Sequence, residues 1–298
     1  MLAFIIPVKH PASSRSYARV LELLRKTLQS IGRSTDPGYV VVIVSQSRPA
    51  WANTVSNAVF VEVDFPPPDP PSSQQDAYTW IFRDKGCRNA VGLLHAARFQ
   101  PSHIMFTDAD DLVSNRLVPF VNASPAAAGY YMSHGYVYSN RFKLIERRDE
   151  FWSYCGTSHI IRADLLPVPR FSSMTPSKPD IVSAFDPRYL ERILGDHNQL
   201  RRYCAEQGSP LAPLPFPGAI WRADTGENSS RRWWQQQRFG PIRGRSPTEE
   251  QVTEFALERE PRRLADSARL AAWRARTTMT GLCRRFLSAG GRYGAGRL

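Results

Sequence analysis

Three carboxylates lie close together in the sequence: Asp108, Asp110 and Asp111 follow the short apolar run 104–106. A run this short is typical of a strand, and ligands of open α/β sheets bind at the carboxyl ends of the strands. Carboxylates gathered there repel one another, and a bound Mg²⁺ or Mn²⁺ relieves that repulsion while keeping positions open for substrate phosphates. Helix capping by the Asp before Leu112 is the alternative, but capping needs only one carboxylate. The cluster therefore predicts a site for a metal ion and a diphosphate.

A basic segment upstream is the second place where the sequence offers phosphate chemistry. Lys85, Arg88 and Gly92 stand at the expected start of a helix over 85–99. Backbone N–H groups at a helix start favour a phosphate, and an arginine binds one through two parallel hydrogen bonds. A solvated helix end, in which Gly92 allows close packing of helix on sheet, explains the same residues. This segment alone does not decide between the two interpretations.

Alternating apolar patterns predict the elements that position these residues. Besides the strand before the acidic cluster and the helix over 85–99, we expect strands over 2–8, 39–44 and 59–63 and a helix over 13–31. The proline-rich segment 66–71 predicts a stiff, extended loop. The order strand, helix, strand, strand, helix, strand predicts an α/β fold with a mostly parallel central sheet flanked by helices.

Composition and charge narrow the class of protein. The chain of 298 residues is 42% hydrophobic, which is typical of a globular enzyme rather than a disordered protein. Its net charge is +12, and arginines dominate the stretch from Arg259 onward, which indicates a membrane surface, a nucleic acid or a polyanionic substrate as partner. The four cysteines are widely spaced and no apolar run is long enough to span a membrane. We therefore expect a cytoplasmic protein with reduced thiols.

Two motifs and the first strand together resemble a known family. The motif Lys-Gly-x-Arg-Asn-x-x-Gly at 85–92, the motif Asp-Ala-Asp-Asp at 108–111 and the opening strand at 4–8 are similar to those of family 2 glycosyltransferases of GT-A fold. The resemblance extends from about residue 2 to the region of Asp196, which is most of the chain.

The resemblance implies a domain organisation. A Rossmann-like nucleotide-binding half is expected over 1–112 and an acceptor-binding half over 113–248, so that the glycosyltransferase domain covers 1–248. The remaining residues, 249–298, are expected to form a basic helical extension with a disordered, glycine-rich end.

The resemblance also implies a metal-dependent transfer of a sugar from a nucleotide-sugar donor to an acceptor hydroxyl. Asp108 and Asp110 take the role of the family's Asp-x-Asp pair, which holds Mn²⁺ or Mg²⁺ together with the donor diphosphate, and Asp111 lies beside them. Lys85 and Arg88 are the expected cationic contacts of that diphosphate.

The donor nucleoside is expected at the ends of the first two strands. Pro7 and Lys9 lie at the end of the first strand, although both could simply terminate it. Family members often carry an aspartate after the second strand to bind the base, whereas this chain has Ser-Gln-Ser at 45–47. The amide of Gln46 can hydrogen-bond a base edge. Uridine, and hence a UDP-sugar, is expected from the resemblance alone.

The acceptor is expected in the second half of the chain. Trp152, Tyr154 and Thr157 lie in an aromatic, hydroxyl-rich segment. Aromatic rings stack on sugars and hydroxyls bind sugar hydroxyls, although an aromatic such as Trp152 belongs to a core more often. These three residues are the predicted acceptor contacts.

One aspartate is the predicted catalytic base. Asp196 matches the family's catalytic aspartate, with Gly195 in place of the preceding glutamate. In that role it accepts the proton of the attacking hydroxyl, and the single displacement inverts the anomeric centre. Helix capping is the alternative for Asp196, because 198–204 looks helical.

The later segments allow several interpretations. No histidine in 221–230 completes a metal site, so Asp224, Glu227 or water are the candidates, and a surface loop is the favoured interpretation of that segment. The arginine-rich helix predicted within 249–298 either lies on an anionic membrane or packs on the body. A peripheral position at the inner membrane face would suit an acceptor of cell-envelope, polysaccharide or glycolipid biosynthesis.

Two other classes of function remain. A nucleotidyltransferase uses a related sheet and metal site, but it normally has a glycine-rich phosphate loop after the first strand, where this chain has Lys9-His10-Pro11. A non-enzymatic nucleic-acid-binding protein is suggested by the basic charge and by Trp233 and Trp234 between arginines. That class leaves the acidic cluster unexplained, so no nucleic-acid partner is expected.

Overall fold

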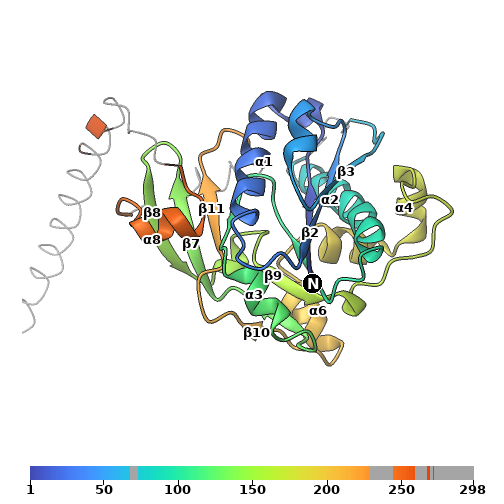
Figure 1. The fold of residues 1–298 in the computed structure, drawn as a ribbon. Coiled ribbons are helices and arrows are strands. Elements are labelled where there is room, and N and C mark those ends of the chain that lie inside the picture. Colours follow the sequence, from blue (N-terminus) through green and yellow to red (C-terminus); the bar gives the residue numbers. More distant parts are fainter. Residues whose placement is uncertain (68–72, 229–243, 259–266, 269–270, 272–298) are drawn as a thin grey trace, which may run out of the picture.

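A seven-stranded sheet runs through the middle of the molecule (Figure 1). The computed structural model describes residues 1–67, 73–228, 244–258, 267–268 and 271. In order across the sheet, the strands are β10 (Ala212–Pro213), β6 (Gly129–Tyr131), β9 (His159–Arg162), β4 (His103–Phe106), β1 (Leu2–Pro7), β2 (Tyr39–Ser45) and β3 (Ala58–Glu62). The strands β3, β2, β1 and β4 are parallel, and β9 is antiparallel to both of its neighbours. The predicted mostly parallel sheet is confirmed.

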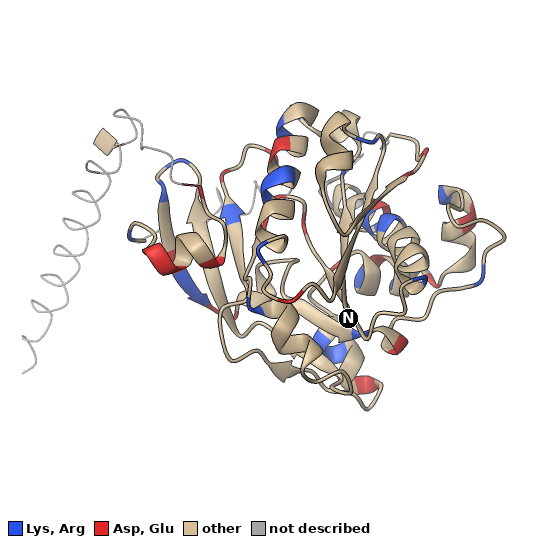
Figure 2. Ribbon diagram, in the orientation of Figure 1, with Lys and Arg blue, Asp and Glu red and all other residues tan. Residues whose placement is uncertain are grey.

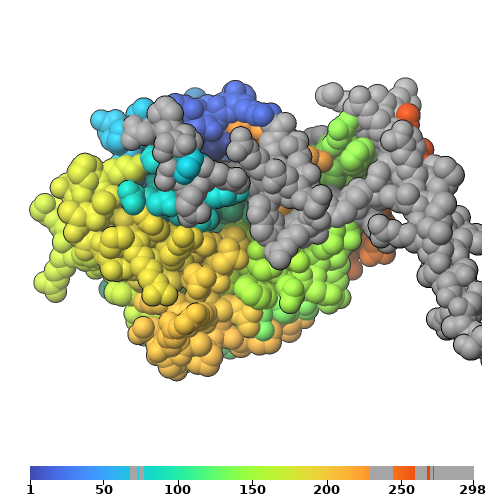
Figure 3. Space-filling view, turned by 180° about the vertical axis from the view of Figure 1, so that it is seen from behind, coloured from blue at the N-terminus to red at the C-terminus, as the bar shows by residue number. Residues whose placement is uncertain are grey.

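Helices cover both faces of this sheet, as predicted. One face carries α1 (Tyr17–Ile31) and α3 (Leu117–Asn122). The other carries α2 (Gln74–Ala97), α4 (Lys178–Ala184), α5 (Pro187–Tyr189), the π-helix η5 (Leu190–Leu194) and α6 (Leu200–Glu206). Viewed from behind, the yellow segment that contains α4 and η5 lies directly beside the cyan α2 (Figure 3). Short 3-10 turns occur at η1 (Pro11–Ser13), η2 (Ala50–Thr54), η3 (Phe151–Ser153) and η4 (Ala163–Leu165).

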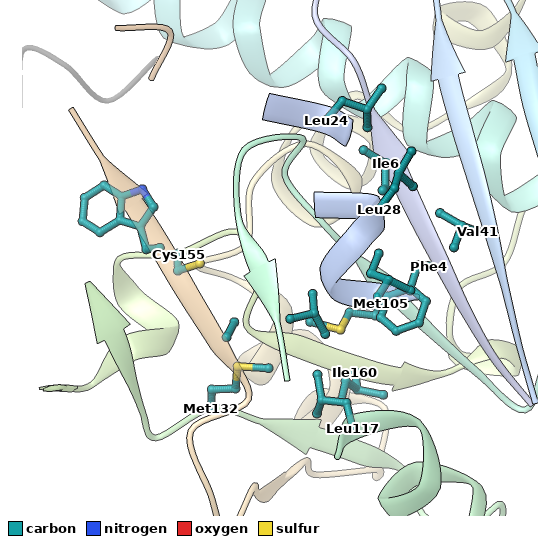
Figure 4. Close-up of a cluster of buried hydrophobic side chains, with 14 of the residues drawn as sticks. Phe4, Ile6, Leu24, Leu28, Val41, Met105, Leu117, Met132, Cys155 and Ile160 are labelled. Carbon is teal, nitrogen blue, oxygen red and sulfur yellow. The ribbon is translucent and has the colours of Figure 1, made fainter. Parts of the chain in front are cut away.

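Alternation along β1 explains why the sheet is covered on both faces. Phe4 and Ile6 point into the core on the α1 side, which Figure 4 shows together with Leu24. Ala3 and Ile5 belong to the second core, on the α2 side. A strand that is apolar at every position fits such a doubly covered, parallel sheet. Most Lys, Arg, Asp and Glu positions of the described chain accordingly lie outside the central strands of this sheet (Figure 2).

A second, four-stranded sheet stands beside the first. Its order is β5 (Leu112–Val113), β11 (Ala219–Ala223), β7 (His134–Ser139) and β8 (Leu144–Asp149). Because β5 follows the acidic cluster directly and the next helix starts only at Leu117, the alternative of helix capping by the Asp before Leu112 is wrong.

The boundary predicted at residue 249 is wrong. After a backbone pairing of Arg245 with Ile145, the chain forms α8 (Glu249–Glu254) and then buries Phe255 and Leu257 in the core of the second sheet. The body therefore extends at least to Glu258, where the carboxylate pairs with Lys26 at 2.6 Å. Nearly all of the predicted basic helix lies outside the described residues. Among the described residues, no helix is long and apolar enough to cross a membrane.

The start of α2 also differs from the prediction. The helix begins at Gln74 rather than at 85, so Lys85 and Arg88 lie in its middle and contact no phosphate through a helix start. Gly92 packs on β1: a Cβ there would lie 2.3 Å from Ile5 Cγ2. Close packing of helix on sheet, the alternative for this glycine, is therefore correct.

Candidate active site

A cavity of about 770 Å³ opens at the carboxyl ends of β1 and β4. Ligand pockets commonly measure about 300–1,000 Å³. Most of the residues predicted from the sequence to contact the donor, the metal ion or the acceptor meet in this cavity: Pro7, Lys9, Lys85, Arg88, Asp108, Asp110, Tyr154 and Asp196. Residues more than 180 positions apart thus share one space.

The two outward carboxylates of the acidic cluster have different partners. Asp108 Oδ1 accepts a hydrogen bond from Lys85 Nζ at 2.5 Å. Asp110 Oδ2 accepts from Asn228 Nδ2 at 3.0 Å and from Thr225 Oγ1 at 3.3 Å. One carboxylate is therefore paired with a cation, whereas the hydrogen-bond donors to the other, among the residues that the structure describes, are neutral.

The third carboxylate points inward. Asp111 is fully buried and accepts hydrogen bonds from Thr157 Oγ1 at 2.6 Å, Cys155 Sγ at 3.2 Å and the backbone N of Arg222 at 3.3 Å. The Thr157 hydroxyl also accepts from the backbone N of Asp108 at 2.9 Å. Thr157 is fully buried, so its predicted contact with the acceptor is wrong, and it positions the acidic loop instead.

Burial and mutual repulsion shift the pKa values of these acids. Burial, and then the charge of Asp108, raise the pKa of Asp110 to about 6. Burial pushes the pKa of Asp108 upward, but the ammonium of Lys85 outweighs it and holds that pKa below its ordinary value. Burial and the two neighbouring carboxylates raise the pKa of Asp111 well above its ordinary value. Of the two carboxylates that face the cavity, Asp110 is thus the one whose ionised form the protein stabilises less.

These groups fit a divalent ion that is shared with a ligand. Asp108 and Asp110 supply oxygens of the right type, and their repulsion is what a cation would relieve. No group of three or more His, Cys, Asp or Glu side chains in the described part of the chain is arranged to hold a metal ion. Mg²⁺ is usually bound by one or two protein carboxylates, and its other ligands are oxygens of substrate phosphates and of water.

The candidates for a further metal ligand have other roles. Asp224 accepts hydrogen bonds from Ser139 Oγ at 2.7 Å and from the backbone N of Asn140 at 2.7 Å. Glu227 pairs with Lys9 Nζ at 2.6 Å and accepts from the backbone N of Ser16 at 2.8 Å. Both carboxylates therefore stabilise loops.

The segment 224–228 is a wall of the cavity and not the predicted surface loop. Thr225 and Glu227 are buried, and Glu227 and Asn228 line the cavity. The turn needs left-handed backbone at Gly226, where φ is +88°, and glycine adopts this conformation without strain. The predicted stacking patch at Trp233 and Trp234 lies outside the described residues.

Asp196 lies where η5 ends and lines the same cavity as Asp108 and Asp110. Its Oδ1 accepts hydrogen bonds from the side-chain Nδ2 of Asn198 at 2.8 Å and from the backbone N of the same residue at 3.2 Å. The N-cap of α6 is Gln199, so capping does not explain Asp196. The carboxylate is buried to 7% exposure but still lines the cavity, as a base that meets a ligand must.

Two glycines bring η5 close to α2. A Cβ at Gly195 would lie 2.0 Å from the carbonyl oxygen of Phe82, and one at Gly86 would lie 2.1 Å from that of Leu190. The glycine that replaces the family's glutamate is therefore needed for the contact between η5 and α2. That contact places Asp196 in the same cavity as Lys85.

Sequence reasoning missed two features of the cavity. His197 lines it beside Asp196, with Nδ1 3.8 Å from Oδ1; burial, and then the charge of Lys85, lower the pKa of this histidine. Aromatic residues from the first turns of α2 form another wall, where Phe82 stacks on Tyr78 and lies under the guanidinium of Arg192 at 5.5 Å. A lone histidine gives no sequence signal, but the pattern Ser-x-x-Asp at 73–76 is a capping box that indicates an earlier helix start.

Three predicted contacts lie elsewhere or are engaged otherwise. Arg88 lines the cavity but is 1% exposed, and its Nε donates to Asp84 at 2.9 Å. Gln46 donates its amide to the carbonyl oxygen of Phe65 at 3.1 Å and does not line the cavity. Trp152 lies under the guanidinium of Arg201 at 4.5 Å, also outside the cavity lining.

No family model and no curated protein matches the chain. Solved structures do match it. In fold, the chain resembles glycosyltransferases. S. aureus TarS is 10% identical over 78% of this chain and 38% of its own, with a TM-score of 0.42. The structure of S. aureus TarS 1-349 in complex with UDP is 11% identical over 78% of this chain and 62% of its own, with a TM-score of 0.42. The mannosyltransferase PcManGT from Pyrobaculum calidifontis, in complex with GDP-Man and Mn²⁺, is 13% identical over 74% of this chain and 56% of its own, with a TM-score of 0.39.

The chain spans less than two thirds of the length of each of these three structures. The similarity is one of fold.

The repulsion within the acidic cluster predicts that Asp110→Asn stabilises the metal-free protein. Between its ordinary pKa of 3.8 and about 6, the folded protein binds a proton that the unfolded chain releases, so stability falls as pH rises through this window. The amide keeps both hydrogen bonds without the charge, and above about pH 7 we expect a gain on the order of 1–2 kcal/mol. Thermal melts with a chelator should show a higher Tm at neutral pH and no gain near pH 4. A lower Tm of Asp110→Asn at neutral pH would show that the ionised carboxylate of Asp110 does not destabilise the folded protein.

Proposed function

We propose that the protein is a glycosyltransferase that moves a sugar from a nucleoside diphosphate sugar to an acceptor hydroxyl, with a divalent metal ion and with inversion. The observation that carries the proposal is that two unlike groups line one cavity. Asp108, Asp110 and Lys85 offer a metal–diphosphate site, and Asp196 offers a general base. A donor and an acceptor can therefore meet between them.

The proposed transfer follows from the charges of these residues. Asp108 and Asp110 would hold a divalent ion, which stabilises negative charge on the leaving diphosphate when it is bound. Lys85 donates hydrogen bonds to the same leaving oxygens. Asp196 accepts the proton of the acceptor hydroxyl as the new bond to the anomeric carbon forms and the bond to the diphosphate breaks. Attack opposite the leaving group inverts the anomeric centre.

The donor and the acceptor are proposed in outline. The resemblance favours a UDP-sugar, with the nucleoside beside Pro7 and Lys9, which line the cavity. The acceptor would lie beside Asp196, between Tyr154 and the aromatic wall of α2. We further propose a cytoplasmic enzyme of cell-envelope, polysaccharide or glycolipid biosynthesis that reaches an anionic membrane surface through its arginine-rich C-terminal segment.

A thermal-shift panel of nucleoside diphosphates and nucleotide sugars, with and without Mn²⁺ or Mg²⁺, tests the donor side. A ligand present at 100 times its Kd stabilises the folded state by about 2.7 kcal/mol. We expect a rise in Tm that needs both a metal ion and one nucleotide sugar, and that is lost in Asp110→Ala. Asp164→Ala is the control, because this exposed aspartate pairs with Arg162 at 2.7 Å and does not line the cavity. Absence of a shift with every donor would contradict the proposal.

A nucleotidyltransferase is the second candidate, because it also needs two carboxylates at a strand end. The chain after β1 passes through the short turn η1 (Pro11–Ser13), with no glycine-rich phosphate loop there. The two activities release different products. Release of a nucleoside diphosphate from a nucleotide sugar supports the glycosyltransferase, whereas release of pyrophosphate from a nucleoside triphosphate supports the alternative.

A further inference from the structure

Lys85 and Asp108 form an ion pair in the lining of the cavity. Lys85 comes from the middle of α2 and Asp108 from the loop after β4, and their side chains are 24% and 34% exposed. Burial lowers the pKa of Lys85, but the opposing charge of Asp108 more than compensates and raises it overall. Without a ligand, the ammonium of Lys85 therefore occupies the carboxylate of Asp108, which a metal ion would need as a ligand.

The protein is built around this pair. Gly156 lies against it: a Cβ there would be 2.5 Å from Asp108 Oδ2 and 3.0 Å from Lys85 Nζ. A side chain at this position would displace one or both partners. The backbone N–H of Asp108 is in turn fixed by Thr157 Oγ1, so the loop that carries the carboxylate has little freedom to turn away from the lysine.

Because of this pair, the carboxylates of Asp108 and Asp110 differ in the charge of their partners. Asp108 is already paired with a cation, whereas the hydrogen-bond donors to Asp110 in the described part of the chain are the neutral side chains of Asn228 and Thr225. A divalent ion that arrives alone is repelled by the ammonium and finds one carboxylate occupied. A diphosphate carries negative charge that attracts the ammonium and frees Asp108 for the ion.

We propose that Lys85 makes metal binding conditional on the diphosphate: it occupies Asp108 in the empty cavity and moves onto the diphosphate when the nucleotide arrives. This inference rests on the proposed function, because it assumes that a nucleoside diphosphate binds. It makes Lys85 a positioning residue whose effect is visible in metal binding without turnover. Nucleotide and metal then bind cooperatively, and the cavity does not retain metal ions between reactions.

Mn²⁺ titrations of the full-length chain, followed through the paramagnetic resonance signal of free Mn²⁺, test the proposal with and without UDP. We expect Lys85→Met to bind Mn²⁺ alone about tenfold tighter than wild type, and UDP to raise the Mn²⁺ affinity of wild type by a similar factor but not that of Lys85→Met. Lys85→Arg keeps the cation and should bind Mn²⁺ alone as weakly as wild type. Thermal melts confirm that each variant is folded.

The matched control is Arg83→Gln. Arg83 lies on the same helix and pairs with Glu191 at 2.6 Å, so this variant also removes one positive charge but leaves Asp108 paired. Its affinity for Mn²⁺ alone should stay near that of wild type. Equal affinities of Lys85→Met and Arg83→Gln for Mn²⁺ alone overturn the proposal, as does UDP that binds wild type without raising its Mn²⁺ affinity. If no nucleoside diphosphate binds at all, the proposed function fails, and the comparison with Mn²⁺ alone still decides whether Lys85 competes for Asp108.

Discussion

Asp196→Asn is expected to lower the rate of sugar transfer by about 10²–10⁴, the usual contribution of a general base. The amide can still accept the hydrogen bonds of Asn198 but cannot take a proton from the acceptor. Folding and donor binding should be unchanged, because the amide has the shape of the carboxylate and, in the described part of the chain, Asp196 is not a hydrogen-bond partner of Asp108, Asp110 or Lys85. The measurement is the initial rate of nucleoside diphosphate release with acceptor, together with the donor-induced rise in Tm.

Two further readings separate a base from a structural residue. Hydrolysis of the donor by water, measured without acceptor, should fall much less than transfer. Asn198→Ala removes one of the hydrogen bonds to Asp196 and leaves the carboxylate in place, so it should retain most of the transfer rate. A near-normal transfer rate in Asp196→Asn would assign the base to another residue, and His197 is the neighbour to replace next.

Gly195→Ala is expected to be strongly damaging. The added Cβ would lie 2.0 Å from the carbonyl oxygen of Phe82 and 2.7 Å from that of Glu191, and backbone atoms cannot turn aside as a side chain can. Overpacking of this kind costs about 1–3 kcal/mol, and here it also pushes η5 away from α2. We expect a clear fall in Tm and in transfer rate, measured by thermal melting and by product release.

The control for this substitution is Gly32→Ala. That glycine follows α1 in helical backbone, with φ of −64°, and its nearest contact would be 3.3 Å, so the Tm should change little. If Gly195→Ala left both Tm and transfer unchanged, the close contact of η5 with α2 would not be what places Asp196.

The first strands and the helix between them were predictable because they depend on local patterns. The strands β1 and β2 are apolar at nearly every position, and α1 repeats its apolar residues at helical spacing, as the sequence indicates. The start of α2 was not predicted, because Tyr78 and Phe82 were not recognised as part of a helix. These two aromatic residues line the cavity, and the sequence does not show the cavity.

The site was predictable only as residue types and not as contacts. The acidic cluster identified the right strand end, yet its sequence could not show that Asp111 faces inward while Asp108 and Asp110 face the cavity. The same difficulty affected the hydroxyl of Thr157, which lies against Asp111, because partners more than 40 residues apart leave no spacing pattern. The contact between Gly195 and α2 likewise depends on a π-helix that no periodicity announced.

The inward orientation of Asp111 has a consequence for how variants of this chain would be interpreted. Its carboxylate joins the loop after β4 to the segment at 155–157 and, through the backbone of Arg222, to the second sheet. Loss of that carboxylate would leave three buried partners unsatisfied, and such a variant would be cleared from a cell before its activity mattered. In a survey of variants, position 111 would show low abundance, whereas positions 108 and 110 would show abundant, inactive protein. Neighbouring acids of one motif would thus give two distinct phenotypes.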